Sequence, residues 1–139
     1  MTVRFVLDTD TVVDVLRRRH GVAARLARES PDDVGLSAMT LAELHFGAHV
    51  SHDPEGARLD VERFAEVVRL LPFGEAAARQ HADIRAALRR KPIGPNDLVI
   101  AATALAFGAT LVTNNRREFD RVPGLSVATW RDAAGTRRD

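Results

Sequence analysis

The sequence predicts an α/β domain in which a central, mostly parallel sheet is flanked by helices. Short apolar, β-branched runs of strand length alternate along the chain with longer segments of helical periodicity. Strands that alternate with helices are typical of a parallel sheet covered on both faces. With 139 residues, the chain is long enough for one domain with a substantial core.

The first half of the chain contains two predicted strands, each followed by helical segments. The first strand is apolar apart from Arg4 and runs directly into Asp8-Thr-Asp10-Thr11. Apolar residues then recur on one helical face until Gly21 breaks the pattern. The expected elements are a strand at 3–7, a helix ending near 19, a helix at 22–28, a turn at 30–33, a strand at 34–37, a helix from 40 to about 50 and a loop at 51–56.

The second half carries three longer helices and further short strands. The helix that follows Pro95 is apolar nearly all round and should be buried, and Gly108 should end it. The residues expected to face the core from the helix at 58–71 are Leu59, Phe64, Val67, Val68 and Leu71. The other expected elements are a turn at 72–74, helices at 75–90 and 96–107, a strand at 110–113, a loop or short helix at 114–121 and an edge strand at 127–129. We expect residues 1–130 to form the domain and 131–139 to be a polar tail that frays.

Composition and charge exclude several classes of protein. The chain has no cysteine, which excludes disulfides and thiolate metal sites. It has no signal-peptide layout and no apolar stretch long enough to span a bilayer, which favours a cytoplasmic protein without a membrane partner. The net charge of +1 creates no general attraction for nucleic acid. Basic residues do cluster at 17–19, 89–91, 116–117 and 137–138, although solvated helix ends would have the same composition.

Three acidic residues lie next to apolar sequence at a strand end or a helix start. Asp8 follows the first strand, Glu43 opens the helix after the second strand, and Asp97 heads the apolar helix. Each also has a purely structural interpretation. Asp8 suits a helix N-cap, Glu43 completes the capping-box pattern Thr40-x-x-Glu43, and Asp97 is favoured by the helix dipole. No single position decides between the two interpretations.

The three acids are more informative together, because functional sites of such sheets form outside the carboxyl ends of the strands. Three carboxylates that converge there repel one another, so at least one pKa would have to rise unless a cation were bound. Mg²⁺ or Mn²⁺ resolves the repulsion and keeps waters that can be activated. His45 and His49 are four residues apart, as in a zinc pair, but lack an apparent third ligand and are expected to be structural or surface residues.

Three motifs stand in a characteristic order along the chain. They are Val6-Leu-Asp8-Thr, then Leu41-Ala-Glu43-Leu-His-Phe-Gly47, then a long stretch from Ile93-Gly-Pro-Asn-Asp97 through Gly108 and Thr113-Asn-Asn115-Arg-Arg-Glu118-Phe119 to Leu125. With these motifs, essentially the whole chain resembles the PIN domain, and specifically the VapC toxins of bacterial toxin–antitoxin pairs. The third motif is the most specific. The resemblance implies a flap-nuclease-like α/β/α sandwich.

The resemblance also implies an endoribonuclease that depends on Mg²⁺ or Mn²⁺. Asp8, Glu43 and Asp97 match the acidic metal-binding positions of the family, so Asp8 and Asp97 should hold the ion, while Glu43 helps to hold it or orients the attacking water. Many relatives carry a fourth acid where this chain has Asn115. One metal, or one tight and one weak, is therefore the expectation.

Other residues are expected to support this site. Thr113 should hydrogen-bond a carboxylate or a water, and Asn96 should help to position Asp97. Glu118 and Asp120 would contribute only at a distance. The residues expected to hold the RNA backbone at the rim are Arg89, Arg90, Lys91, Arg116 and Arg117.

The resemblance further implies partners. They are an RNA substrate, a VapB-type antitoxin whose C-terminal segment lies over the active site, and a second copy of the chain in a homodimer. We expect the RNA to be a tRNA, and the stretch 112–119 is similar to the branch of the family that attacks initiator tRNA.

Two other interpretations are compatible with parts of the sequence. Asp8-Thr-Asp10-Thr-Val12 satisfies the signature of a haloacid-dehalogenase-type phosphatase, with Asp8 as nucleophile. That family also requires a late acidic pair, where this chain has Asn114-Asn115. The second alternative is a catalytically silent PIN domain that works only as a binding module, although all three acids are present.

Overall fold

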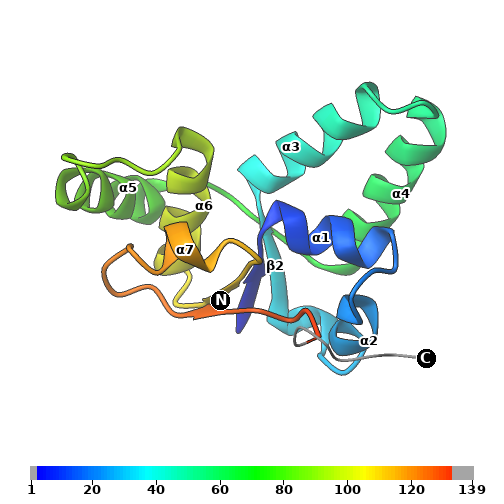
Figure 1. Cartoon of the computed structure of the whole chain (residues 1–139), viewed down its shortest axis with the longest axis horizontal. Coiled ribbons are helices and arrows are strands. Elements are labelled where there is room, and N and C mark those ends of the chain that lie inside the picture. The colour runs from blue at the N-terminus through cyan, green and yellow to red at the C-terminus, as the bar shows by residue number, and fades with distance from the viewer. Residues whose placement is uncertain (1–2, 133–139) are drawn as a thin grey trace.

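The computed structural model describes residues 3–132 and contains a five-stranded parallel sheet in the order β3-β2-β1-β4-β5 (Figure 1). The strands are β1 (Phe5–Leu7), β2 (Val34–Ser37), β3 (Arg69–Leu71), β4 (Thr110–Val112) and β5 (Val127–Ala128). The helices are α1 (Thr9–Leu16), α2 (Val22–Leu26), η1 (Pro31–Asp33, a 3₁₀ turn), α3 (Ala38–His49), α4 (Pro54–Val67), α5 (Glu75–Ala87), α6 (Pro95–Ala106) and α7 (Arg116–Phe119). This arrangement confirms the predicted α/β class.

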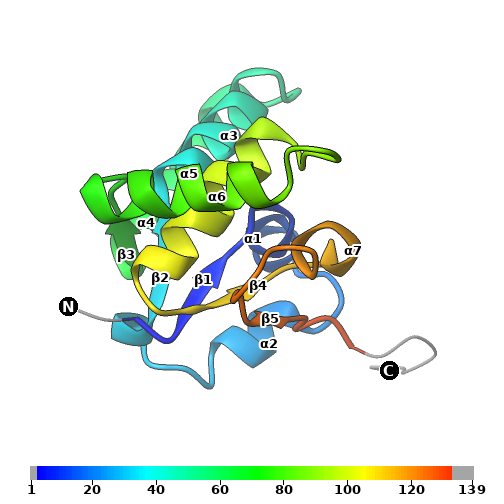
Figure 2. The same ribbon diagram turned by 90° about the vertical axis from the view of Figure 1, so that its left-hand side faces the viewer.

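Alternate strand residues separate two cores, one on each face of the sheet. Val6 and Leu111 join a cluster that includes residues of α5 and α6. Their neighbours Leu7 and Val112 join a second cluster with residues of α1 to α4. Successive strand side chains point to opposite faces, so two buried faces require apolar residues at both positions. Figure 2 shows α5 and α6 side by side over the sheet, with α2 at its opposite side.

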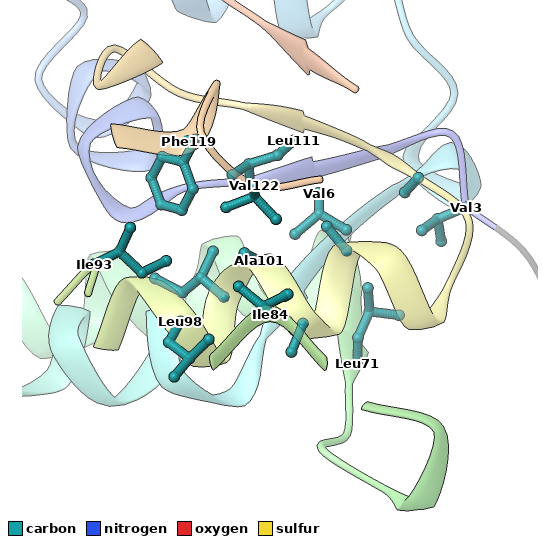
Figure 3. Packing of buried hydrophobic residues seen from close by; sticks show 14 residues of the cluster. Val3, Val6, Leu71, Ile84, Ile93, Leu98, Ala101, Leu111, Phe119 and Val122 are labelled. Carbon is teal, nitrogen blue, oxygen red and sulfur yellow. The ribbon is translucent and has the colours of Figure 1, made fainter. Parts of the chain in front are cut away.

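Helix α6 is the most deeply buried helix among the described residues, as its composition predicted. Ile100 and the run 101–104 are fully buried, and the small alanines allow α6 to lie close to the strands. Figure 3 shows Leu98 and Ala101 on α6 among Ile84, Leu111 and Phe119. Each large side chain that is fully buried contributes roughly 1.5–3 kcal/mol to stability. Gly108 follows the helix at a φ of +65°, the left-handed conformation expected at a helix end.

The prediction for residues 58–71 was wrong in two respects. The helix begins at Pro54, inside the predicted loop, because Asp53 caps it by accepting from the N–H of Gly56 at 3.1 Å. It also ends at Val67, and the following residues form β3 beside β2. Val61 therefore faces the core, whereas Leu59 and Val67 are exposed. Pairing with the sheet outweighs the local helical pattern of the sequence at 69–71.

Helix boundaries elsewhere differ by a few residues from those predicted. Helix α1 ends at Leu16, and Arg18 and His20 adopt positive φ angles of 52° and 60°. Helix α3 begins at Ala38, because Ser37 is its N-cap and accepts from the N–H of Thr40 at 3.0 Å. Among residues 3–132, no helix has both the length and the apolar character needed to cross a membrane.

The predicted fraying tail also needs correction at its start. Arg131 binds Asp14, and the N–H of Asp132 donates to the carbonyl of His20 at 3.0 Å. These two residues are therefore part of the folded domain. Residues 133–139 of the predicted tail, and the basic cluster at 137–138, lie outside the described residues.

Candidate functional site

The candidate site lies where the strand order reverses, between β1 and β4. Parallel α/β sheets bind ligands outside the carboxyl ends of their strands at such a point. Asp8 directly follows β1, and Thr113 directly follows β4. In Figure 1, α1, α3 and α7 start from this end of the sheet. The topology thus places the first predicted acid at the position that favours ligand binding.

Asp8 is almost fully buried and held at both carboxylate oxygens. Its Oδ1 accepts from the N–H of Thr9 at 2.8 Å, and its Oδ2 accepts from the hydroxyl of Thr113 at 2.7 Å. The first bond makes Asp8 the N-cap of α1, so the structural interpretation also holds. Burial raises the pKa of Asp8 to about 7, and the negative charges of Asp10 and Asp97 add to the rise, while the Thr113 and Thr9 bonds oppose it.

Glu43 does not form the predicted capping box, because it lies in the second turn of α3, past the cap at Ser37. Its Oε1 accepts from the hydroxyl of Thr9 at 2.5 Å, and its Oε2 accepts from Nδ2 of Asn96 at 3.0 Å. Glu43 therefore joins the starts of α1 and α6. Asn96 was expected to position Asp97, but its hydrogen bond goes to Glu43 instead.

Asp97 lies in the first turn of α6 and is half-buried. Burial raises the pKa of Asp97, and the negative charges of Glu43, Glu118 and Asp10 raise it further. These acids are therefore close enough to repel one another. Within residues 3–132, no hydrogen bond or ion pair holds the Asp97 carboxylate, in contrast to those of Asp8 and Glu43.

Asp10 also lies at this site, although the sequence indicated a role for it only within the phosphatase signature. Its Oδ2 accepts from the backbone N–H of Asn114 at 3.1 Å, and its Oδ1 lies 3.3 Å from the hydroxyl of Thr11. Burial raises the pKa of Asp10, although these hydrogen bonds oppose the rise. The sequence feature that could have identified Asp10 is Asp8-Thr-Asp10, in which two acids flank one residue directly after a buried strand. Asn115, at the family's fourth acidic position, is partly buried beside this site.

The predicted basic clusters are connected by a contact that the sequence did not indicate. Arg121, just past α7, donates from Nη2 to the carbonyl of Lys91 and so joins the segment after α5 to the end of α7. Arg89, Arg90, Lys91 and Arg117 are exposed. Arg116 is also exposed and makes a long contact of 3.4 Å with Asp120. Solvent-facing cations on two adjoining segments are available to an anionic ligand, and their contact with RNA stays a prediction.

The acids fit a hard divalent cation by their chemistry. Carboxylate oxygens are the preferred protein ligands of Mg²⁺ and Mn²⁺. Burial, with smaller contributions from neighbouring negative charges, raises the pKa values of Asp8, Asp10 and Asp97. No three acidic or histidine side chains among residues 3–132 are already arranged as a metal-binding group. His45 and His49 likewise join no third ligand within that range.

An α/β/α fold with acids at the carboxyl edge of its central strand is compatible with a nuclease. The PIN domain model matches residues 5–125. The chain therefore belongs to the PIN-domain family.

Known relatives narrow the assignment. The tRNA(fMet)-specific endonuclease VapC of Salmonella typhimurium is 36% identical over 129 residues, which are 91% of this chain and 98% of that protein. Ribonuclease VapC2 of Haemophilus influenzae is 35% identical, with the same coverage of 91% and 98%. Within the PIN family, the chain is thus one of the VapC ribonuclease toxins.

Solved structures agree with this assignment. The crystal structure of DNA-bound VapBC from Salmonella typhimurium matches with a TM-score of 0.85 at 35% identity, over 93% of this chain and 99% of that chain. The structure of VapBC-1 from nontypeable Haemophilus influenzae matches with a TM-score of 0.80 at 31% identity, over 91% and 97%. The predicted fold and family are confirmed.

Proposed function

We propose that this VapC ribonuclease is a Mg²⁺- or Mn²⁺-dependent endonuclease that cleaves a tRNA and is inhibited by a VapB-type antitoxin. One observation carries the metal dependence. The carboxylates of Asp8 and Glu43 converge on Thr9, at its N–H and its hydroxyl, and burial together with neighbouring negative charges raises the pKa values of Asp8, Asp10 and Asp97. A divalent cation relieves that repulsion. PIN nucleases are generally metal-dependent, which supports the same proposal.

Asp8 and Asp97 would hold the ion, with Glu43 beside them. When bound, the ion would activate a water and offset the charge that develops on the phosphate. The protein's own contribution is to hold the carboxylates in place. Thr113 and the N–H of Thr9 fix Asp8, while the Thr9 hydroxyl and Asn96 fix Glu43. Ligands held in this way by neighbouring groups need little reorganisation when the ion binds.

The fourth acidic charge of the site would come from Asp10. Asn115 is neutral where many relatives carry an acid, and Asp10 approaches from α1 instead. Its charge contributes to the raised pKa values of both Asp8 and Asp97. We therefore infer that Asp10 strengthens the attraction for one ion and that any second ion binds weakly.

The proposed substrate is a tRNA, and the initiator tRNA in particular. The Salmonella typhimurium relative, named as a tRNA(fMet)-specific endonuclease, supports this choice. The exposed residues Arg89, Arg90, Lys91, Arg116 and Arg117 would hold the RNA backbone on the segments joined by Arg121. Phosphodiester cleavage requires cations that bind and position the phosphates around a metal-binding centre.

The proposed antitoxin would insert a basic side chain among the acids. A groove of about 210 Å³ opens beside Thr9 and Glu43, and its apolar lining includes Leu16, Leu44 and Val61. An amphipathic peptide in this groove would reach the acids directly. The relatives solved as VapBC assemblies support such a partner. A homodimer is proposed as well, and the exposed Phe46 on α3 and Val50 directly after this helix supply apolar surface for it.

Sequencing the 5′ ends of cellular RNA after brief expression tests this function, with Asp97→Ala as the control. We expect new ends in one tRNA that are absent with Asp97→Ala, and cleavage of that tRNA by the purified protein only with Mg²⁺ or Mn²⁺. A catalytically silent binding module would produce no new ends. A phosphatase would release phosphate from monoesters and leave tRNA intact.

A further inference from the structure

The turn that follows β4 holds two of the acids. The hydroxyl of Thr113 accepts from the N–H of Asn115 at 2.9 Å, so its single proton is directed to Oδ2 of Asp8 at 2.7 Å. The backbone N–H of Asn114, the residue between Thr113 and Asn115, donates to Oδ2 of Asp10 at 3.1 Å. The positions of both carboxylates therefore depend on the conformation of residues 113–115.

An ion pair between the buried Asp14 and the partly exposed Arg131 fixes this turn from one side. Nδ2 of Asn114 donates to Oδ2 of Asp14 at 3.0 Å. Arg131 binds the same carboxylate through two hydrogen bonds. Its Nε donates to Oδ2 at 2.7 Å, and its Nη2 donates to Oδ1 at 3.1 Å. The Asp14 side chain is 2% exposed, so it is effectively removed from water. Burial alone raises the pKa of Asp14, but the bonds from Arg131 and Asn114 outweigh that effect and lower it.

The segment that carries Arg131 holds the turn at a second point. The hydroxyl of Thr129 donates to the carbonyl of Thr113 at 2.9 Å. Between these two contacts, Trp130 is buried, with its ring edge-on to Phe5 at a centroid distance of 5.1 Å. The segment 129–131 is thus anchored by its own aromatic residue.

The end of this segment is anchored as well. The N–H of Asp132 donates to the carbonyl of His20 at 3.0 Å. Gly21 lies against this segment, and a Cβ at that position would come within 2.6 Å of the Asp132 carboxylate unless that side chain moved. Gly21 also has a φ of +72°, which disfavours other residues. The chain between α1 and α2 therefore accommodates the C-terminal segment.

We propose that the segment 129–131 positions the active-site acids through the turn 113–115. Arg131 acts through Asp14 and Asn114 on Asp10, and Thr129 acts through Thr113 on Asp8. The pair joins the buried Asp14 carboxylate to a partly exposed Arg131 side chain, and its two hydrogen bonds orient the carboxylate that receives the Asn114 amide. The inference rests on the proposed function in that Asp8 and Asp10 are taken as parts of the metal site. Arg131, Asp14 and Thr129 are positioning residues, because they act on the acids only through Asn114 and Thr113.

The test uses a charge-neutral pair of substitutions, Asp14→Asn with Arg131→Gln, in the full chain. It leaves no unpaired buried charge, and its melting temperature should stay close to that of the wild type. Mn²⁺ affinity, measured by calorimetry, should fall roughly tenfold, and kcat should fall by ~10–100-fold while KM for the RNA stays constant, because the acids rather than the RNA contacts are displaced. The matched control is Glu75→Gln with Arg79→Gln, which removes the same two charges from an exposed pair on α5.

Two milder variants keep the proposal falsifiable if the double variant does not fold. Thr129→Val removes the hydroxyl that donates to the carbonyl of Thr113 and should lower kcat and Mn²⁺ affinity, and Thr129→Ser should restore both. Arg131→Lys keeps the charge but cannot form both hydrogen bonds to Asp14, so its losses of kcat and Mn²⁺ affinity should be intermediate. In the metal-free protein, both Thr129→Val and Arg131→Lys should shift the amide resonances of Asn114 and Asn115.

The proposal is overturned if folded variants keep wild-type Mn²⁺ affinity and kcat and leave these amide resonances unmoved. It is also overturned if the losses match those of the Glu75/Arg79 control. Wild-type protein that neither binds Mn²⁺ nor cuts RNA would contradict the proposed function instead. The amide resonances would still report whether the segment positions the turn.

Discussion

The hydroxyl of Thr113 donates to Oδ2 of Asp8 at 2.7 Å, across the point where the strand order reverses. Both residues are buried, and each directly follows a strand of the central pair β1 and β4. Because the two strands are adjacent and in register up to Leu7 and Val112, the contact follows from the sheet itself. The bond gives Asp8 one orientation before any ligand arrives.

Thr113→Val should lower activity and shift its pH dependence. The Thr113 bond lowers the pKa of Asp8, so its removal lets that pKa rise further, and the acid limb of the kcat/KM profile should move to higher pH. The lost buried bond should also lower stability by about 1–3 kcal/mol. Profiles of wild type, Thr113→Val and Thr113→Ser would check this, and Thr113→Ser should behave like the wild type. An unmoved acid limb in Thr113→Val would count against the role of this bond.

The metal-free protein should lose stability as pH rises. Asp8 has a pKa of about 7 in the folded chain against an ordinary value of 3.8, so between these values the folded state binds more protons than the unfolded state. The free energy of unfolding therefore decreases from about pH 4 to about pH 7, by roughly 4 kcal/mol at most for this group. Below about pH 4 this loss is absent, and above about pH 7 it is complete.

Urea unfolding in a chelating buffer would measure this slope. Asp8→Asn should flatten it and should be more stable than the wild type at about pH 8. Added Mg²⁺ should restore stability to the wild type at that pH but not to Asp8→Asn. Equal slopes for the two proteins would contradict the raised pKa of Asp8.

Asp10→Asn should weaken metal binding although the family pattern does not include this residue. Removing its charge lowers the pKa values of Asp8 and Asp97, but it also removes attraction for a divalent cation. Mn²⁺ affinity and kcat should both fall, by ~10–100-fold. Asp83→Asn, which removes an exposed acid from α5, should leave both unchanged. Wild-type Mn²⁺ affinity in Asp10→Asn would show that Asp10 lies outside the metal site.

Local patterns in the sequence identified the parts of the site that lie at element ends. The position of Asp8 after a buried strand and of Asp97 in the first turn of an apolar helix could be read from neighbouring residues, and the structure places both there. Glu43 was singled out together with these two acids, although its own local pattern suggested a capping box that Ser37 replaces. A pattern of four residues does not show where a helix begins when an earlier side chain can cap it.

Contacts between distant residues could not be predicted in the same way. Arg131 and Asp14 are 117 positions apart, and the sequence there gave no sign of a pair, so a polar tail was the expectation. Asp10 was missed as a site residue for a similar reason, because its partner Asn114 lies 104 positions away. Strand β3 was taken for the end of a helix, since the pairing with β2 that stabilises it is not encoded in its own three residues.

The central claim is that the acids around Asp97 form a metal-dependent cleavage site, and Asp97→Asn tests it most directly. The measurement is single-turnover cleavage of initiator tRNA with Mg²⁺, together with urea unfolding in a chelating buffer. Burial and neighbouring negative charges raise the pKa of Asp97, so neutralising it should leave the metal-free fold at least as stable as the wild type. Cleavage should be lost, by at least ~10³-fold. An Asp97→Asn protein that is folded and cleaves at the wild-type rate would contradict the account.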